Sequence, residues 1–268
     1  EQQAARRWRV FSRLIWLALF GGILWLVYVG QTTTTTTSSP HTAVIDIKGE
    51  IADGAEASAE YVVGSLKTAF EDSGAQAVVL LINSPGGSPV QAGIINDEIH
   101  RLKALHDKKV YAVVEETCAS AAYYIASAAD EIYVDKASMV GSIGVLMDGF
   151  GFTGLMEKLG IERRLLTAGA NKGMLDPFSP QDETQRAYIQ TMLSEIHAQF
   201  IAVVKKGRGE RLKETPDTFS GLVWNGQQAV QLGLADGLFF HMLERCVRVQ
   251  QALAAQAHGV SIGVNASA

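Results

Sequence analysis

Ser120 and Lys172 have the residue types and surroundings that nucleophilic catalysis requires. Ser120 lies in the segment TCASAA (117–122), after an apolar run that predicts a strand and among small residues that favour a helix. A serine at the start of a helix sits at the positive end of the helix dipole, with its N–H free of partners within the helix. The same position suits a serine that only caps the helix. The residues alone leave both interpretations open.

A nucleophilic serine needs a general base, and the histidines of this sequence are poor candidates for it. None of them lies in a glycine-rich segment or at the end of a predicted strand, and each is interpreted as a surface residue. The six are His41, His100, His106, His197, His241 and His258.

Lysine is the other base that can serve a serine, provided that its site keeps the amine neutral part of the time. Lys172 lies in AGANKGM (168–174), among small and apolar residues, with no acid until Asp176. Four other lysines lie in charged runs and are expected to be solvated, namely Lys108, Lys109, Lys205 and Lys206. Lys172 is therefore the best candidate for the base.

A glycine-rich turn, NSPGGS (83–88), follows the continuous apolar run AVVLLI (77–82). Paired glycines let a backbone approach a ligand closely with its N–H groups exposed, as stabilisation of an oxyanion requires. Pro-Gly-Gly is also a common structural turn, and that interpretation stays open.

The elements that must position these residues alternate between strands and helices. Strands are predicted at 43–47, 77–82, 110–114 and 131–134, and helices at 60–72, 90–105, 119–129, 182–206 and 227–232. A fully apolar run such as 77–82 is typical of a strand that is buried on both faces of a parallel sheet. The pattern predicts an α/β fold with a largely parallel sheet.

Residues 14–30 are uncharged and apolar, and approach the length that a membrane-spanning helix needs. Four arginines precede them in residues 1–13, which predicts a basic cytoplasmic segment and a domain across the membrane. The alternatives are a cleaved signal peptide, for which the cleavage site would be poor, and a buried core helix, which should show a polar face. Residues 31–40 (QTTTTTTSSP) predict a linker, 41–250 the globular domain and 251–268 a flexible tail. The chain begins at Glu1, so upstream residues are expected to be missing.

The composition excludes several classes of function. The 268 residues carry a formal net charge of −5, so no binding of nucleic acid is expected. Two cysteines, Cys118 and Cys246, cannot form a metal cluster or a disulfide framework. A single bridge between them stays open, but two free, mostly buried thiols are favoured, because Cys118 lies in a run of small apolar residues. Neither a metal nor a cofactor is predicted.

Five segments together resemble the signal peptide peptidase A family, the S49 serine peptidases, in its short form. They are NSPGG (83–87), CASAAYYIASAAD (118–130), MVGSIGV (139–145), NKGMLDPFSP (171–180) and WNGQQAVQLGLAD (224–236). The resemblance covers 41 to about 245 together with the apolar segment 14–30.

The resemblance implies a ClpP/crotonase-like fold and a Ser/Lys dyad, with Ser120 as nucleophile and Lys172 as general base. It implies an oxyanion hole formed by Gly87 and the backbone N–H of Ser120, and a hydroxyl on Ser142 that orients the lysine. Short forms assemble into homo-oligomeric rings, in which subunits can complete one another's dyads.

The implied substrates are cleaved signal peptides and other short hydrophobic peptides. The implied location is the bacterial inner membrane, crossed once by the anchor in contact with lipid, with the peptidase domain on the outer side. The sequence leaves two rivals: a crotonase-type acyl-CoA enzyme, and a non-enzymatic membrane scaffold in which Ser120 is a helix cap.

Overall fold

A computed structural model describes residue 16, residues 19–22, residue 25 and residues 39–239. Most of the predicted anchor (14–30), most of the linker (31–40), Cys246 and the predicted tail (251–268) lie outside these residues. In the part of the chain that is described, no helix is both long enough and apolar enough to cross a bilayer.

Within residues 39–239, seven strands form one mixed, largely parallel sheet in the order β1-β2-β3-β4-β7, with β5 paired to β3 and β6 paired to β5. Among the strand pairs that the described residues form, only β5–β6 is antiparallel. The prediction of an α/β fold with a largely parallel sheet is therefore confirmed. The strands are β1 (His41–Ile51), β2 (Ala75–Gly87), β3 (Lys109–Ala119), β4 (Glu131–Val134), β5 (Met139–Gly141), β6 (Val223–Asn225) and β7 (Gly237–Leu238).

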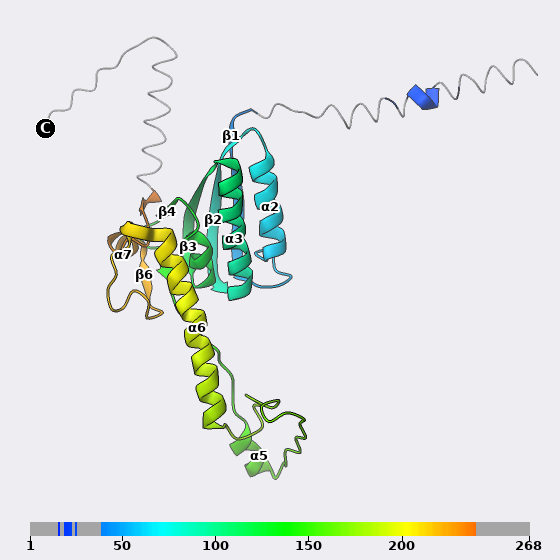
Figure 1. Cartoon of the computed structure of the whole chain (residues 1–268), viewed down its shortest axis with the longest axis vertical. Coiled ribbons are helices and arrows are strands. Elements are labelled where there is room, and N and C mark those ends of the chain that lie inside the picture. The colour runs from blue at the N-terminus through cyan, green and yellow to red at the C-terminus, as the bar shows by residue number, and fades with distance from the viewer. Residues whose placement is uncertain (1–15, 17–18, 23–24, 26–38, 240–268) are drawn as a thin grey trace, which may run out of the picture.

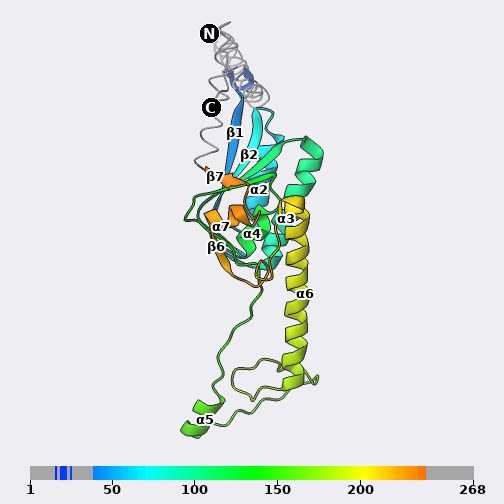
Figure 2. The same ribbon diagram turned by 90° about the vertical axis from the view of Figure 1, so that its left-hand side faces the viewer.

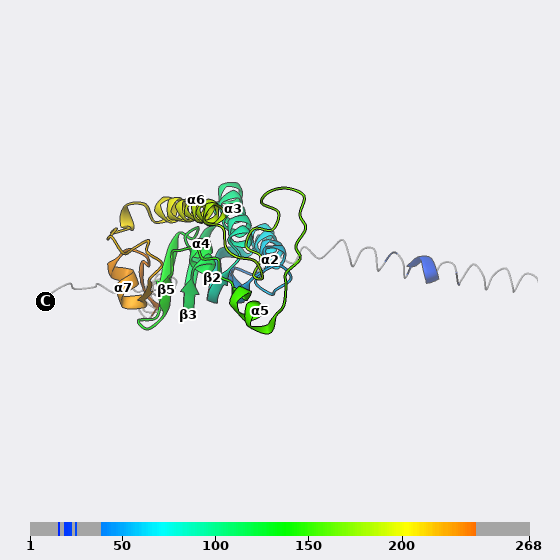
Figure 3. The same cartoon turned by 90° about the horizontal axis from the view of Figure 1, so that it is seen from below.

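Helices cover one face of the sheet and bury alternate residues of its strands. Figure 3 shows α2 (Ala59–Glu71), α3 (Pro89–His106) and α4 (Ala121–Ala126) on the same side of the central strands. On β2 the side chains of Val78, Leu80 and Ile82 are fully buried. The hydrophobic core lies between this face and the helices. Its packing fixes where the ends of the central strands lie relative to the helices.

The parallel register brings three turns to one edge of the sheet. Ser84 of β2 pairs with Cys118 of β3, and Ala119 of β3 pairs with Gly141 of β5. Because the carboxyl ends of parallel strands meet at one edge, the turns after β2, β3 and β5 become neighbours.

Residues 144–196, which we call the arm, project from this body (Figures 1 and 2). The arm contains α5 (Thr153–Leu159) and the first half of α6 (Glu183–Arg208). None of its residues is buried in the single chain, whereas Phe200, Val204 and Arg208 in the second half of α6 are buried in the body. The chain returns through η1 (Gly209–Arg211) and α7 (Gly226–Gln231).

The predicted elements are present, with some shifted boundaries. The helix expected at 119–129 is only α4, 121–126, because β3 continues to Ala119, where it pairs with β5. The strand predicted at 131–134 has those bounds. The helix predicted at 182–206 runs from 183 to 208.

Candidate active site

Ser120 stands at a sharp turn between β3 and α4. Its backbone has φ 54° and ψ −123°, a conformation that non-glycine residues adopt only when their surroundings enforce it. Ser120 occupies the N-cap position of α4, yet its side chain makes no capping hydrogen bond. The cap interpretation therefore loses its physical basis. A serine on a strained strand-to-helix turn is the geometry that presents a nucleophilic hydroxyl.

The strained turn is held from two sides. The N–H of Ser120 donates to the carbonyl oxygen of Gly141 at 2.8 Å. On the other side lies Gly86, where a β-carbon would stand 2.7 Å from the Cβ of Ser120 and 2.8 Å from the oxygen of Ala119. The NSPGGS turn thus packs directly against Ser120, and it can do so because Gly86 has no side chain at the point of contact.

The backbone N–H of Ser120 is not free, contrary to the sequence-based expectation that it helps to form an oxyanion hole. Because Ala119 of β3 pairs with Gly141 of β5, the N–H of the next residue, Ser120, donates to the carbonyl oxygen of Gly141. The N–H of Ala121, the first residue of α4, has no partner within the helix. The Ala121 nitrogen also lies at the Gly86 turn, 3.0 Å from the position that a β-carbon on Gly86 would take.

Gly87 lies against the neighbouring strand β1. A β-carbon on Gly87 would stand 2.2 Å from the carbonyl oxygen of Ile51, and the N–H of Ser88 donates to that oxygen at 2.7 Å. The two glycines of the turn therefore have different tasks. Gly86 makes room for Ser120, and Gly87 lets the turn pack against β1.

Ser142, the expected orienter of the lysine, follows directly on the residue that accepts the N–H of Ser120. It is half-buried, has φ 49°, and donates its N–H to the oxygen of Leu222 at 2.8 Å. The structure thus brings Ser120, Ser142 and the Gly86 turn together at one edge of the sheet.

Lys172 lies elsewhere in the same chain. It is exposed in a turn of the arm, where its N–H donates to the oxygen of Gly169 at 3.1 Å. The small and apolar neighbours that made it the best candidate for the base lie on the arm, which projects from the body (Figure 1), and residues 168–172 are all exposed in the single chain. Ser120 belongs to the body, so one chain alone does not bring the two residues together.

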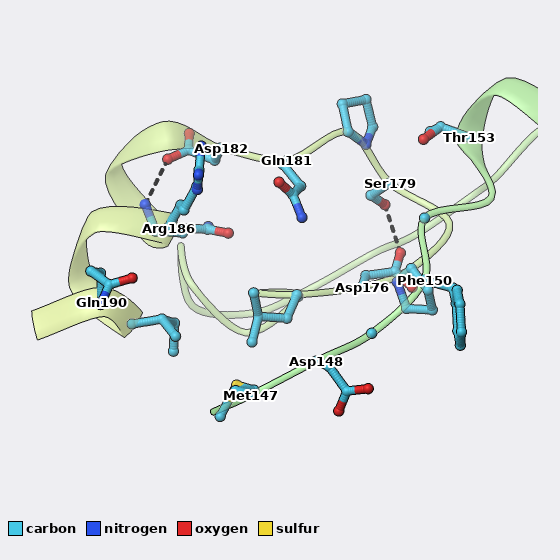
Figure 4. A pocket seen from close by; sticks show the side chains of 18 of the residues that line it. Met147, Asp148, Phe150, Thr153, Asp176, Ser179, Gln181, Asp182, Arg186 and Gln190 are labelled. Carbon is cyan, nitrogen blue, oxygen red and sulfur yellow. Dashed lines mark hydrogen bonds between the residues drawn. The ribbon is translucent and has the colours of Figure 1, made fainter. Parts of the chain in front are cut away.

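The arm contains a cavity of about 590 Å³ of its own. Its lining comes from 147–153, from 173–182 and from the first turns of α6, and it includes neither Ser120 nor Lys172. Asp182 caps α6 by accepting the N–H of Gln185, and Ser179 donates to Asp176 at 2.6 Å (Figure 4). That hydrogen bond from Ser179 is the main cause that lowers the pKa of Asp176.

The arm also exposes large apolar side chains. Phe150 is 80% exposed and Leu166 is 96% exposed. Apolar side chains that are gathered on one exposed segment are typical of a surface that contacts another molecule.

His197, which the sequence analysis interpreted as a surface residue, makes a contact close to the candidate site. Its Nε2 donates to the carbonyl oxygen of Ile143 at 3.0 Å, and its side chain is half-buried. Only the three-dimensional approach of α6 to the segment after β5 reveals this contact, since the sequence shows just a histidine in an amphipathic helix.

Comparison with known proteins identifies the family. The sequence pattern of Peptidase family S49 matches residues 103–255, which include Ser120, Ser142 and Lys172. A protein of Enterococcus faecium named signal peptide peptidase SppA is 32% identical over 200 residues, which are 72% of this chain and 58% of that protein. A protein of Synechocystis named as a protease is 31% identical over 198 residues, 73% of this chain and 69% of that protein.

A further relative carries a different name. A protein of Brucella melitensis named Na(+)/H(+) antiporter NhaA is 50% identical over 175 residues, 65% of this chain. The chain spans only 24% of that protein and 58% of the Enterococcus relative. The matched segment is thus a part of longer proteins whose other regions have no counterpart in it.

Proposed function

The chain belongs to peptidase family S49, and from that premise we propose that Ser120 is its nucleophile and Lys172 its general base. The chain is a serine peptidase, which sets aside the crotonase-type enzyme and the non-enzymatic scaffold. The observation that carries the assignment of Ser120 is its strained backbone at the β3–α4 turn, together with a hydroxyl that caps nothing.

The proposed reaction runs in two steps. The neutral amine of Lys172 takes the proton of the Ser120 hydroxyl, while the Ser120 oxygen attacks the carbonyl carbon of the peptide bond. The tetrahedral intermediate collapses, the leaving amine takes the proton from Lys172, and an ester to Ser120 remains. Water then attacks this ester with Lys172 as base, which releases the acid and restores the serine.

We propose that the oxyanion of the intermediate is stabilised by the N–H groups of Gly87 and Ala121. The Ala121 N–H lies at the positive end of α4 and lacks a partner within the helix. Ser120 could contribute its own N–H only if Gly141 released it. We further propose that the Ser142 hydroxyl orients the incoming lysine, since Ser142 follows the residue bonded to Ser120.

The dyad is proposed to form between neighbouring chains of a homo-oligomeric ring. Three observations support this arrangement: Lys172 is exposed, its arm projects from the body, and apolar side chains such as Phe150 and Leu166 are uncovered on the arm. Packing of the arm against a second copy would bury these side chains and bring Lys172 to a neighbouring Ser120.

Mixing two inactive variants tests the nucleophile, the base and their arrangement together. Ser120→Ala and Lys172→Ala are each expected to lose peptidase activity by about a thousandfold or more. When the two are unfolded and reassembled as an equal mixture, about a quarter of the sites in a cyclic oligomer should pair an intact Ser120 with an intact Lys172 from a neighbour.

The expected result is activity in the mixture and almost none in either variant alone. Ser120→Ala mixed with the double variant Ser120→Ala/Lys172→Ala is the matched control and should stay inactive. A mixture as inactive as this control would contradict a dyad between chains. Full activity of Lys172→Ala alone would contradict the assignment of the base.

The substrates are proposed to be cleaved signal peptides and other short hydrophobic peptides, in line with the name of the Enterococcus relative. The domain is proposed to occupy residues 41–250, with a ClpP/crotonase-like arrangement. Residues 14–30 are proposed to cross the bacterial inner membrane and to hold the domain on its outer side, near the bilayer from which such peptides emerge.

Membrane extraction tests the anchor. The full chain is expected to stay with the membranes at alkaline pH, and Leu19→Arg/Ile23→Arg to be released, because a charge in the middle of a span costs about 3 kcal/mol. Release of the unchanged chain would contradict an anchor. Protease added to spheroplasts should digest the domain, and protection there would contradict its location on the outer side.

A further inference from the structure

We propose that His197 is a positioning residue for catalysis. It ties α6, whose first half belongs to the arm, to the segment 141–144, which contains Ser142 and accepts the N–H of Ser120. This inference rests on the proposed dyad. It concerns a contact within one chain, between α6 and the residues that follow β5.

The contact lies at the root of the arm. Ile143 is fully buried, and from Gly144 onward the chain enters the arm, where no residue is buried until Phe200. His197 lies where α6 returns to the body, one turn before Phe200. The hydrogen bond from His197 Nε2 to the Ile143 oxygen, 3.0 Å long, therefore joins the outgoing and the returning chain.

The segment from Gly141 to Gly144 bears directly on the candidate nucleophile. The oxygen of Gly141 accepts the N–H of Ser120 at 2.8 Å, and Ser142 follows with its left-handed backbone. Movement of the Ile143 carbonyl would thus be passed through one or two peptide units to both serines.

A second contact joins α6 to the other side of the same turn. The ring of Phe200 packs on that of Tyr124 in α4, with centroids 5.1 Å apart. α4 begins directly after Ser120. α6 therefore contacts both the helix that follows Ser120, through Phe200, and the segment after β5, through His197.

On the arm side, α6 continues from His197 to Glu183 as one helix. Lys172 lies eleven residues before that helix begins. Because the helix is continuous, its attachment at the root sets the direction in which the arm leaves the body. His197 thereby links the geometry of the Ser120 turn to the placement of Lys172 toward a neighbouring chain.

Two substitutions in the full-length protein test this role. His197→Ala removes the donor, whereas His197→Gln retains an amide N–H that can reach the Ile143 oxygen. With a fluorogenic hydrophobic peptide, His197→Ala is expected to lower kcat by about tenfold or more with KM changed less than about twofold, because small displacements of catalytic groups have large effects. His197→Gln should recover most of the lost kcat.

The control is Gln199→Ala, an exposed position two residues along the same helix, which should keep full activity. Thermal unfolding and the size of the oligomer are measured for every variant, and the comparison rests on His197→Gln if His197→Ala fails to fold. A kcat of His197→Ala within about twofold of the unchanged protein, or equal losses in the Ala and Gln variants, would overturn the proposal.

The two proposals fail in distinguishable ways. Loss of activity in Lys172→Ala with full activity in His197→Ala overturns only the positioning role. Retained activity in Lys172→Ala overturns the dyad itself, whatever His197→Ala does. Slower labelling of Ser120 by a fluorophosphonate in His197→Ala than in His197→Gln would support the proposal by showing that His197 affects the reactivity of Ser120 as well as the placement of the arm.

Discussion

Gly86 lies against Ser120 so closely that a β-carbon on Gly86 would stand 2.7 Å from the Cβ of Ser120. No other residue type fits there, since real β-carbons do not approach other carbons to that distance. The φ of Gly86, +106°, adds a second reason, because L-residues rarely adopt it. The glycine-rich turn after β2 therefore helps to fix the unusual backbone of Ser120.

Gly86→Ala is expected to lower activity by at least about a hundredfold, since the new methyl group must displace Ser120 from its turn and such displacements are costly in catalysis. The measurements are kcat/KM with a hydrophobic peptide and the rate at which a fluorophosphonate labels Ser120. Both should fall together.

Gly54→Ala is the control that distinguishes the effect of the clash with Ser120 from the effect of a strained backbone. Gly54 also has a positive φ, +73°, but a β-carbon on it would meet nothing within 4 Å. The substitution should cost about 1 kcal/mol of stability and leave the specific activity unchanged. Equal activity losses in the two variants would show that contact with Ser120 is not the cause.

Ser142→Gly is expected to lower kcat by about tenfold or more without loss of stability. Ser142 has φ 49°, a left-handed conformation that glycine adopts without penalty, so the substitution removes the hydroxyl while relieving strain. Asp107→Gly is the matched control, because Asp107 has φ 46° at the end of α3, away from Ser120. It should gain stability and keep full activity. Unchanged kcat in Ser142→Gly would contradict a role for the hydroxyl.

Much of the body could be predicted from the sequence because its signals are local. The run 77–82 became part of a buried strand, and the serine at 120 stands between a strand and a helix as its neighbours suggested. Apolar continuity and small-residue packing act over a few residues, so a single sequence displays them. The use of the Ser120 N–H by Gly141 could not be predicted, because it depends on the register between β3 and β5.

The sequence did not determine whether Lys172 meets Ser120 within one chain or between chains. Small and apolar residues predict close packing, but they do not say which element, or which chain, provides the cover. In the structure these residues lie in an exposed turn of the arm. His197 was undervalued for a related reason, since its partner Ile143 is 54 residues away.

Cys118 is expected to resist thiol reagents in the folded protein. It is fully buried, and burial raises the pKa of its thiol, so the reactive thiolate is scarce at neutral pH. The test is alkylation by iodoacetamide in a Cys246→Ser background, followed by mass spectrometry. Modification should require denaturant, and the unfolded chain is the control for reactivity. Rapid modification of the native protein would contradict a buried Cys118.

Arg208 and Asp236 form the main buried ion pair that ties α6 to the end of the domain. The Arg208 side chain is fully buried and lies 2.8 Å from a carboxylate oxygen of Asp236. Arg208 also donates to the oxygen of Gly233, and Asp236 accepts the N–H of Ile132. Burial alone would raise the pKa of Asp236. The hydrogen bond and charge of Arg208, together with the N–H of Ile132 and the charge of Arg211, outweigh burial, and the pKa is lowered.

Asp236→Asn is expected to lower the free energy of unfolding by about 3 kcal/mol at neutral pH, because it leaves Arg208 charged, buried and short of a counter-ion. The lowered pKa means that the pair stabilises fully above the ordinary carboxyl pKa of about 3.9 and loses this effect as pH falls through the folded-state pKa. Urea unfolding of both proteins should therefore show a difference that shrinks below about pH 4. Glu214→Gln breaks the exposed Lys205–Glu214 pair and should cost less than about 1 kcal/mol. A pH-independent difference would show that packing, not charge, makes Asp236 important.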